Sequence, residues 1–512
     1  MKQWKLLPVL FLLMLLACTV SRTRVVYEPK SESITILHTN DMHANFLPSV
    51  VRGEGTPIAN KKIGGFLALD SYIRKIRSSE SNVLLLDAGD FMTGNPICDM
   101  EVDGALGGAL VKFMNQMGYD GLTLGNHEFD ISVENTRRLM ALAQFPIFSS
   151  NLFTADGKLF TSEAYQIYSK GNLTIGVIGV VVPDLPNYLN KPQRDEVYDK
   201  PARPIIDSLA KIIDPITDLI IVLSHQGLEA DRQLAQELGR QVDVIIGGHS
   251  HSRLEKPERV NGKIIVQTGS YCRNLGRLNL VVAADTVQSY QYELIALWNE
   301  AIQPDSSLAR QVSYYEQQIN EEYGRVIGEL KTPWFRAKSG ESNLGNFIAD
   351  CIREFSEADF ALINSGGIRQ DLPAGPIKKL DIKNILPFNN LITKFIVSGD
   401  ELLKLIEHNA LAQSSGTEGI LQISGLTYEW RMKADSSVVI LKAQIGNEPI
   451  VPQKTYTGAT VDFVVGNADK YFGFVPQVVT NLMMPLTDVV MKAVEKKQII
   501  ASAIEGRIIK RD

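Results

Sequence analysis

The chain has 512 residues, which is enough for two large domains or three modest ones at about 150 residues each. Its composition, 45% hydrophobic and 21% charged, is ordinary for a soluble globular protein and excludes disordered, fibrous and polytopic membrane proteins. No Lys/Arg-rich block offsets the net charge of −6, so the basic surface expected of a protein that binds a nucleic-acid polymer is missing.

Residues 1–33 are predicted to be an export signal with a short tether rather than part of the fold. Lys2 and Lys5 precede the apolar run "LLPVLFLLMLLA", which is too short for a membrane span. In "LLAC", Cys18 resembles the cysteine of a bacterial lipobox, which is lipidated after cleavage. The alternative is a plain signal peptide with an incidental cysteine. We expect export to the bacterial periplasm or cell surface, with a lipid anchor on Cys18 as the one membrane attachment.

The other cysteines, Cys98, Cys272 and Cys351, are too sparse to be the main support of an exported chain of this length. One disulfide among them stays an open alternative. After the signal, no segment approaches 18 unbroken apolar residues, so no membrane span is expected.

Residues 34–304 are predicted to form a layered α/β domain. Short apolar runs such as "ITILHT", "NVLLLDAG" and "VDVIIGGH" are bounded by Gly, Asn, Asp and Ser, which is typical of buried strands, and amphipathic stretches between them predict covering helices. Residues 305–332 contain a long polar stretch that predicts a connecting helix. Residues 333–512 begin with the helical pattern "SNLGNFIADCIREF" and continue with short strands and Gly-rich turns, which predict a second α/β domain.

Five of the seven histidines directly follow a predicted strand, and two aspartates occupy equivalent places. These residues are Asp41, His43, Asp90, His127, His225, His249 and His251. In layered α/β folds, residues at the carboxyl ends of strands converge even when they are far apart in sequence. Imidazole and carboxylate suit ions such as Zn²⁺, Mn²⁺ or Fe²⁺, and a carboxylate such as Asp90 can bridge two ions. The pattern therefore predicts a two-metal site that hydrolyses a phosphate ester by in-line attack.

Each of these signals has a structural alternative when it is taken singly. A lone histidine at a strand end is more often a hydrogen-bonded loop residue than a metal ligand, and Asp87 and Asp90 could be helix caps. Likewise, Asp130 could cap the following helix and His127 could be structural. Several loops with the same chemistry favour the metal site over these alternatives.

The motifs "HTNDMHANF", "LLLDAGDFMTG", "LGNHEFD", "SHQG" and "GGHSH" resemble those of the calcineurin-like metallophosphoesterases, specifically the exported 5′-nucleotidase and UDP-sugar hydrolase family. The resemblance extends over nearly the whole mature chain. It implies an N-terminal four-layer α/β/β/α metallophosphoesterase sandwich, a connecting helix and a C-terminal α/β nucleotide-binding domain.

The resemblance also implies two divalent metal ions, zinc, manganese or similar, with a bridging hydroxide that attacks the phosphorus. One ion would be held by Asp41, His43, Asp90 and His251. The other would be held by Asp90, Asn126, His225 and His249. Relatives often have Gln or Asn at position 251, so His251 is a variation that can still ligate.

His127 and Asp130 are expected to form a catalytic dyad. Three residues apart on a first helical turn, they share a face, so the carboxylate can fix the imidazole tautomer and stabilise its cation. In the family, this dyad is thought to stabilise the transferring phosphoryl group or to protonate the leaving oxygen. We expect structural roles for Glu128 and Phe129, which lie between them.

The C-terminal domain is expected to hold the substrate, because "INSGGIR", "PFNN" and "DFVVGNADKYF" resemble segments in which two phenylalanines stack on the base and an aspartate binds the ribose. The implied binding residues are Asn364, Gly366, Gly367, Arg369, Phe388, Asn390, Phe463 and Asp469. The phenylalanines could instead be core residues. Two departures weaken this part of the resemblance: "GNADKY" replaces a "GGDG"-like turn, and no arginine directly precedes Glu341.

The implied activity is that of a 5′-nucleotidase, with nucleoside diphosphates or UDP-sugars as further substrates. One alternative is a 2′,3′-cyclic-nucleotide 2′-phosphodiesterase with 3′-nucleotidase activity. A thiosulfohydrolase is a third enzyme class, against which the two-phenylalanine motifs argue. A non-catalytic surface binding protein on the same fold would have a degraded ligand set, which this chain does not have. A small nucleotide is the expected ligand, and no protein partner is expected.

Overall fold

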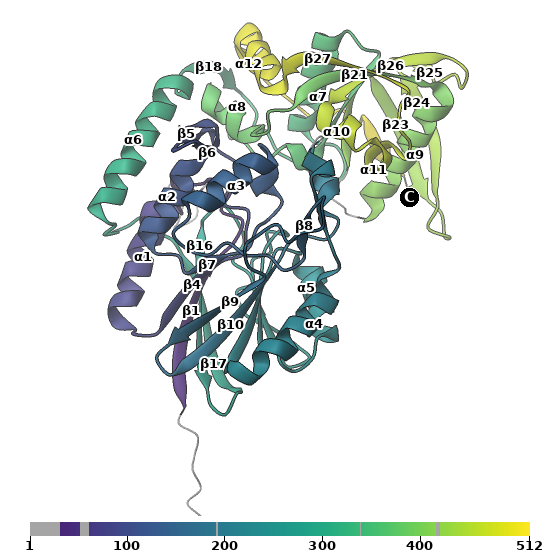
Figure 1. The fold of residues 1–512 in the computed structure, drawn as a ribbon. Helices are drawn as coiled ribbons and strands as arrows, with labels where there is room; N and C mark the ends of the chain where they lie inside the picture. The colour runs from purple at the N-terminus through teal and green to yellow at the C-terminus, as the bar shows by residue number, and fades with distance from the viewer. Residues whose placement is uncertain (1–30, 52–60, 191–192, 338, 416–419, 512) are drawn as a thin grey trace, which may run out of the picture.

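The structure is a computed structural model that describes residues 31–51, 61–190, 193–337, 339–415 and 420–511. Cys18 and residues 1–30 of the predicted export signal and tether lie outside the described residues. The predicted end of the tether at residue 33 was wrong, because Glu32 and Ser33 already belong to strand β1 (Glu32–Thr39) and pair with Val282 and Val281. Figure 1 shows an N-terminal lobe, coloured purple to teal, and a C-terminal lobe, coloured green to yellow. Both lobes mix helices and strands, which confirms the predicted α/β class and two-domain architecture.

Two sheets form the centre of the N-terminal lobe, with strand orders β17-β16-β1-β4-β7 and β14-β15-β13-β12-β10-β9. The strands of the first sheet are β1 (Glu32–Thr39), β4 (Val83–Asp87), β7 (Gly121–Leu122), β16 (Asn274–Val282) and β17 (Val287–Ala296). The strands of the second sheet are β9 (Tyr165–Lys170), β10 (Leu173–Val180), β12 (Leu219–Ser224), β13 (Val244–Gly247), β14 (Glu258–Val260) and β15 (Lys263–Val266). In both sheets the central strands are parallel, so their carboxyl ends lie at one edge.

Helices cover the outer face of each sheet. Because side chains alternate along a strand, Ile34 and Ile36 of β1 pack in the core between the sheets, whereas Leu37 packs in the core beneath the helices. The first sheet is covered by α1 (Phe66–Ser79), α2 (Gly108–Met117) and α3 (Val133–Leu142). The second is covered by α4 (Ala202–Ile213) and α5 (Leu228–Glu237). These layers confirm the predicted α/β/β/α sandwich. Short strands in the loops are β2 (Ser49–Val50), β3 (Lys62–Ile63), β5 (Glu101–Val102), β6 (Ala105–Leu106), β8 (Leu152–Thr154) and β11 (Val197–Asp199).

Helix α6 (Ser306–Tyr323) joins the lobes and runs along the outside of the N-terminal lobe (Figure 1). The side chain of its N-cap, Asp305, accepts hydrogen bonds from the N–H groups of Ser307 and Leu308. Leu308, Val312 and Ile319 are buried in the core of the N-terminal lobe. The predicted connecting helix is therefore packed on one lobe along its apolar stripe.

Three sheets form the C-terminal lobe, with strand orders β22-β19-β26-β21-β27, β25-β24-β23-β29 and β20-β18-β28. Their strands are β18 (Val326–Leu330), β19 (Phe360–Asn364), β20 (Gly375–Lys378), β21 (Leu391–Ser398), β22 (Leu421–Ser424), β23 (Leu426–Met432), β24 (Val438–Ile445), β25 (Glu448–Pro449), β26 (Thr455–Val461), β27 (Val478–Pro485), β28 (Ile499–Ile500) and β29 (Ile508–Lys510). The helices are α7 (Asn343–Ser356), α8 (Lys379–Ile385), α9 (Gly399–Ser415), α10 (Asp462–Gly466), α11 (Ala468–Phe472) and α12 (Leu486–Lys497).

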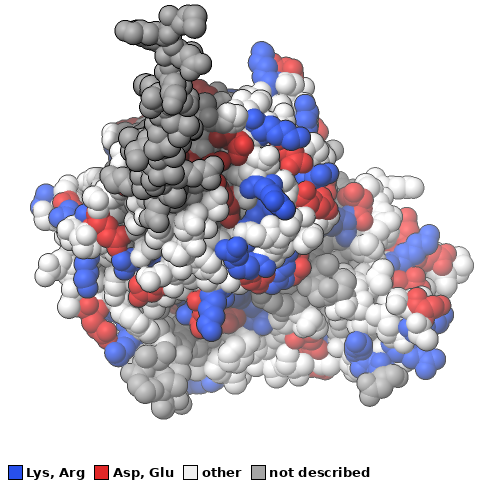
Figure 2. Space-filling view, turned by 90° about the horizontal axis from the view of Figure 1, so that it is seen from below, with Lys and Arg blue, Asp and Glu red and all other residues white. Residues whose placement is uncertain are grey.

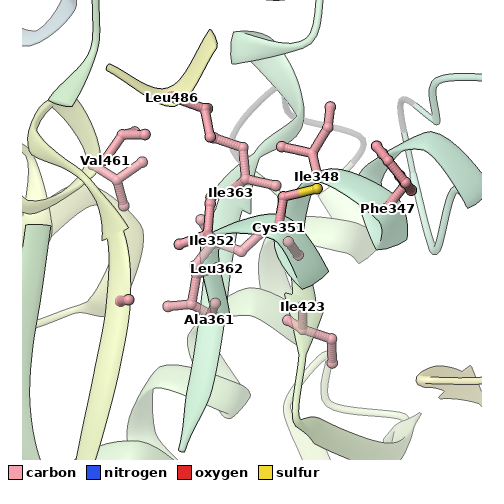
Figure 3. Packing of buried hydrophobic residues seen from close by; sticks show 14 of the residues in the cluster. Phe347, Ile348, Cys351, Ile352, Ala361, Leu362, Ile363, Ile423, Val461 and Leu486 are labelled. Atoms are coloured by element: carbon pink, nitrogen blue, oxygen red, sulfur yellow. The ribbon is translucent and has the colours of Figure 1, made fainter. Parts of the chain in front are cut away.

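Helix α7 anchors the core of the C-terminal lobe. Its N-cap, Ser342, accepts a hydrogen bond from the N–H of Gly345, and its apolar face packs on β19. Figure 3 shows Ile348, Cys351 and Ile352 of α7 beside the buried residues of β19. Cys351 is buried and unpaired, as are Cys98 and Cys272, so no disulfide joins cysteines of the described chain.

The surface carries charges of both signs. In Figure 2, Lys and Arg are interspersed with Asp and Glu over the visible face, in agreement with the modest net charge. Among the described residues, no helix combines the length and apolar character that crossing a membrane requires.

Candidate metal centre and its surroundings

Loops at the carboxyl ends of five strands of the N-terminal lobe converge at one place. The loops after β1, β4, β7, β12 and β13 carry all seven predicted metal ligands. Potential ligand atoms lie within 4.8 Å of one another in three groups, which are Asp41/His43/His251, His43/Asp90/His127 and Asp90/His225/His249. The predicted amide ligand joins the last group, since Oδ1 of Asn126 lies 3.0 Å from Nδ1 of His249.

Five of the seven predicted ligands have a left-handed backbone. The φ angles are 49° at Asp41, 47° at His43, 60° at Asp90, 71° at His249 and 54° at His251. Such angles are uncommon for residues other than glycine, and a protein retains them where the surrounding structure over-determines them. The chain therefore makes sharp turns that aim these side chains at a common point.

Hydrogen bonds fix the orientation of two buried imidazoles. Nδ1 of His43 donates to the carbonyl oxygen of Thr93 at 3.1 Å, and Nδ1 of His225 donates to that of Ala88 at 2.6 Å. In the neutral form of each ring the lone pair is then on Nε2, which is directed into the cluster. Nε2 of His43 lies 2.8 Å from Nε2 of His251, an arrangement that suits a cation shared by both nitrogens.

The ionisation states suit a metal as well. Burial lowers the pKa of His43, His249 and His251 well below the ordinary value, so these imidazoles are neutral, as a metal ligand must be. Burial raises the pKa of Asp90, but His225 and His127 outweigh this effect and hold that pKa well below its ordinary value. Burial lowers the pKa of His225, but Asp90 outweighs burial and raises it to about 10, so this imidazole exchanges its proton for a metal when one binds. Imidazole nitrogens around a buried carboxylate are a donor set that fits a divalent cation of the zinc or manganese type.

Asp90 lies at the middle of the cluster. Its Oδ2 is 3.1 Å from Nε2 of His225 and 4.0 Å from Nε2 of His43, which belong to the two different predicted ligand sets. Its Oδ1 accepts the backbone N–H of His127 at 2.9 Å. This position between the two sets is the one expected of a bridging carboxylate.

Glu128 supports the loop that carries Asp90. The Glu128 side chain is 1% exposed and accepts the backbone N–H groups of Asp90, Met92 and Gly125 at 3.1, 3.2 and 2.7 Å. Burial and the neighbouring Asp90 raise its pKa to about 7. The sequence did not indicate this function, since a glutamate beside a histidine does not show which backbone it will meet. Phe129 is buried in the core of the lobe.

His127 and Asp130 are paired beside the cluster. Nδ1 of His127 lies 2.7 Å from Oδ2 of Asp130, and Nε2 of His127 lies 3.9 Å from Oδ2 of Asp90. Burial lowers the pKa of His127, but the two aspartates outweigh burial and the net pKa is above the ordinary value. A histidine that holds its proton near neutral pH next to a candidate metal site can donate that proton to a leaving group.

Two predicted substrate residues of the C-terminal lobe contact this cluster directly. Nη2 of Arg369 lies 3.3 Å from Nε2 of His43. The ring of Phe388 lies 5.7 Å from that of His127, and the Arg369 guanidinium lies 5.9 Å from the Phe388 ring. Tyr271 of the N-terminal lobe helps to fix the position of Arg369, because its hydroxyl donates to the carbonyl oxygen of Arg369 at 3.2 Å.

The other predicted substrate residues have varied surroundings. Asn364 is buried at the end of β19, directly before the turn that contains Gly366 and Gly367, and its Oδ1 has no hydrogen-bond partner in the described structure. Asn390 is buried, and its carbonyl oxygen accepts the N–H of Leu486. Phe463 packs partly against the core of the C-terminal lobe and edge-on to Tyr471. Asp469 is exposed at the start of α11.

The turn beside Asp469 reaches the N-terminal lobe through contacts that the sequence did not predict. The side chains of Arg194 and Asn467 are hydrogen-bonded, and Nζ of Lys470 lies 4.8 Å from the ring of Tyr188. Tyr188 in turn packs edge-on against His249 at 5.2 Å. An aromatic residue in the Pro/Asn-rich stretch "DLPNYLN" was the one available signal for this contact.

Comparisons with known proteins agree with this architecture. A family model described as calcineurin-like phosphoesterase matches residues 34–253, and one described as 5′-nucleotidase, C-terminal domain, matches residues 326–475. A snake venom 5′-nucleotidase from Naja atra is 28% identical over 496 residues, covering 86% of this chain and 92% of the relative.

Two solved structures share the fold. The 5′-nucleotidase precursor from Thermus thermophilus has a TM-score of 0.84 at 24% identity, covering 94% of this chain and 99% of that chain. The sulfate thiohydrolase SoxB from the same organism has a TM-score of 0.78 at 16% identity, covering 93% and 96%. Because enzymes with different names share this architecture, the fold alone does not select the substrate.

Proposed function

The chain belongs to the two-domain 5′-nucleotidase family and is a metal-dependent phosphoric ester hydrolase, and on this premise we propose that its substrates are nucleoside 5′-monophosphates. The approach of Arg369 to His43 is the observation that carries the proposal. The residues that would act on the phosphate lie in loops of the N-terminal lobe, and the candidate base-binding residues lie in the C-terminal lobe. A 5′-nucleotide has its phosphate and its base at opposite ends, so it matches a site composed in this way.

We propose that two divalent ions bind at the cluster, one held by Asp41, His43, Asp90 and His251 and the other by Asp90, Asn126, His225 and His249. The observation that supports these sets is the convergence of imidazoles and buried carboxylates in three groups, within each of which the potential ligand atoms lie within 4.8 Å of one another. When bound, the ions supply positive charge for the phosphoryl oxygens and activate the attacking water.

The protein's own groups surround the phosphate in this proposal. Arg369 offers a planar guanidinium, which can bind two phosphate oxygens at once. His127, protonated through its pairing with Asp130, delivers a proton to the ester oxygen that leaves. Phe388 stacks on the nucleoside together with Phe463, a contact that tolerates different bases. Asn364, Gly366, Gly367 and Asn390 line the base pocket, and Asp469 binds the ribose.

Chromatographic identification of all products from a panel of substrates, together with inorganic phosphate release for the monoesters, tests this proposal. The panel contains AMP, UMP, ADP, UDP-glucose, the 2′,3′-cyclic and 3′,5′-cyclic isomers of AMP, and bis(p-nitrophenyl) phosphate. Rapid hydrolysis of 5′-monophosphates supports the proposal. Preference for the 2′,3′-cyclic nucleotide and the diester would replace it with the phosphodiesterase alternative, and preference for UDP-glucose would assign a sugar-nucleotide hydrolase. No turnover by metal-loaded protein would indicate a binding protein.

Treatment with EDTA followed by addition of single metals completes the test. Activity should be lost on chelation and return with zinc, manganese or a similar ion, since such donor sets admit several divalent metals.

We also propose that the protein is exported and that Cys18 is its lipid anchor, on the basis of the signal-like N-terminus and the "LLAC" motif. Metabolic labelling with a palmitate analogue should mark the wild-type protein and not the Cys18→Ser variant. Equal labelling of the two would contradict the anchor.

A further inference from the structure

Thr93 occupies an unusual backbone conformation next to the cluster. It follows Asp90 by three residues, is 7% exposed, and has a φ of 64°. A left-handed conformation is a genuine outlier for a β-branched residue, and such outliers persist where several contacts enforce them. Contacts on every side of Thr93 hold it in this conformation.

All three hydrogen-bonding groups of Thr93 are used. Its hydroxyl donates to Oδ2 of Asp130 at 2.6 Å, and this is the same oxygen that lies 2.7 Å from Nδ1 of His127. Its carbonyl oxygen accepts from Nδ1 of His43 at 3.1 Å. Its backbone N–H lies 3.3 Å from the sulfur of Cys98, which is buried and unpaired.

We propose that Thr93 is a positioning residue for the hydrolysis, which holds the carboxylate of Asp130 so that His127 presents Nε2 to the substrate. The proposal rests on the proposed function of the dyad. A carboxylate that accepts from two donors at one oxygen has little freedom to rotate, and the imidazole bonded to it is fixed in turn. The carbonyl of the same residue orients His43. Thr93 therefore fixes the side-chain orientation of both a predicted metal ligand, His43, and the predicted proton donor, His127.

The alternative is that Thr93 only packs the loop. Substitutions distinguish the two, because valine has the shape of threonine without the hydroxyl and serine keeps the hydroxyl without the methyl. Glycine removes the hydroxyl and also relieves the left-handed strain, so Thr93→Gly is expected to fold even if the valine variant does not.

Thr123 provides a matched control. It lies in the adjacent loop, is fully buried, and its hydroxyl has no hydrogen-bond partner in the described structure. Thr123→Val therefore removes a hydroxyl from the same neighbourhood without breaking a hydrogen bond, and its turnover should equal that of the wild type.

The experiment measures kcat, KM and bound metal for Thr93→Val, Thr93→Gly and Thr93→Ser, in the wild-type chain and in a His127→Ala background. We expect the valine and glycine variants to lose about tenfold in kcat with unchanged KM and metal content, which is the scale of one hydrogen bond to a charged group. Serine should restore most of the activity. In the His127→Ala background, the valine substitution should have no further effect, because its partner in the mechanism is gone.

Each contrary result has a distinct meaning. Full activity of the valine or glycine variant, or an equal loss in Thr93→Ser, would overturn the positioning role. The same fractional loss with and without His127 would also overturn it, since Thr93 would then act independently of the dyad. Wild-type protein that hydrolyses no phosphate ester would instead refute the proposed function and the inference that rests on it.

Discussion

Gly125 lies so close to Asp90 that a Cβ atom at position 125 would be 2.2 Å from Oδ1 of Asp90. No real Cβ makes such a contact, and the backbone nitrogen of Asp90 would be only 2.8 Å away. The glycine is therefore required by proximity rather than by its backbone angles. It allows the loop that carries Asn126 and His127 to pass directly over the carboxylate at the middle of the cluster.

Gly125→Ala should displace Asp90 and reduce both bound metal and activity, with loss of turnover of about 100-fold or more, since small misplacements at a reacting centre have effects of this size. The measurements are metal content, kcat and melting temperature. Gly262→Ala is the comparison: Gly262 has a φ of 84° and open space around it, so this change should cost about 1 kcal/mol of stability and leave activity intact. Equal metal content and turnover in Gly125→Ala and the wild type would show that the loops can separate freely.

His127→Ala should lower turnover of a nucleoside monophosphate by roughly 100-fold or more, the usual scale for a general acid, while metal content stays at the wild-type level. If His127 protonates the leaving oxygen, the loss should be much smaller with p-nitrophenyl phosphate, because nitrophenolate leaves without a proton. An equal loss with both esters would indicate that His127 stabilises the phosphoryl group instead. Near-normal turnover by a metal-replete variant would exclude both functions.

Arg369→Lys should raise KM about tenfold with a smaller change in kcat, because an ammonium cannot reproduce a bidentate contact with phosphate. The matched variant is Arg336→Lys, since Arg336 pairs with Asp371 at the surface and its side chain is 36% exposed. A surface ion pair of this kind contributes little to stability, so Arg336→Lys should have the KM and kcat of the wild type. If both lysine variants have wild-type KM values, Arg369 does not bind the phosphate.

Asp243 should make folding stability depend on pH. Burial raises its pKa to about 7 from an ordinary 3.8, and its Oδ2 accepts the N–H of Ile220. The folded protein thus prefers the protonated carboxyl; this stabilisation is complete below pH 3.8 and is lost as the pH rises through 7. Asp243→Asn keeps the acceptor and removes the charge, so its stability relative to wild type should improve between pH 5 and pH 8 by about 1–3 kcal/mol.

Urea unfolding of the wild type and the Asp243→Asn variant at the two pH values gives this difference directly. Asp156→Asn serves as the control, because Asp156 is exposed and its pKa of about 2 places its titration below this range. A constant difference between wild type and Asp243→Asn would mean that Asp243 is ionised throughout.

The sequence predicted the layered fold and the convergence of the candidate metal ligands for physical reasons that can be named. Apolar runs that end in Gly, Asn or Asp predict buried strands, and parallel strands bring their carboxyl ends to one edge. The sequence therefore assigned Asp41 and His225 to the same site at the ends of the strands, although they are 184 positions apart. The order of neighbouring strands was not needed for this conclusion.

Contacts between the lobes and within the loops could not be predicted in the same way. Nothing local to Arg369 shows that it meets His43, and nothing local to Thr93 shows that its hydroxyl meets Asp130, because both contacts depend on how distant segments pack. The phenylalanines illustrate the limit: Phe388 lies against His127, whereas Phe463 also packs on the core of its own lobe. A single sequence does not separate a residue that stacks on a ligand from one that packs beneath it.

The left-handed backbone at Asp41, His43, Asp90, His249 and His251 links the proposed metal ions to folding as well as to catalysis. At about 1 kcal/mol for each residue, these five turns cost about 5 kcal/mol, which is comparable to the whole net stability of a modest domain. A ligand that binds only the folded chain offsets such a cost in proportion to the logarithm of its concentration. A divalent ion at this cluster would thus stabilise the folded chain as well as serve the chemistry, and chelation with EDTA should lower the melting temperature of the protein.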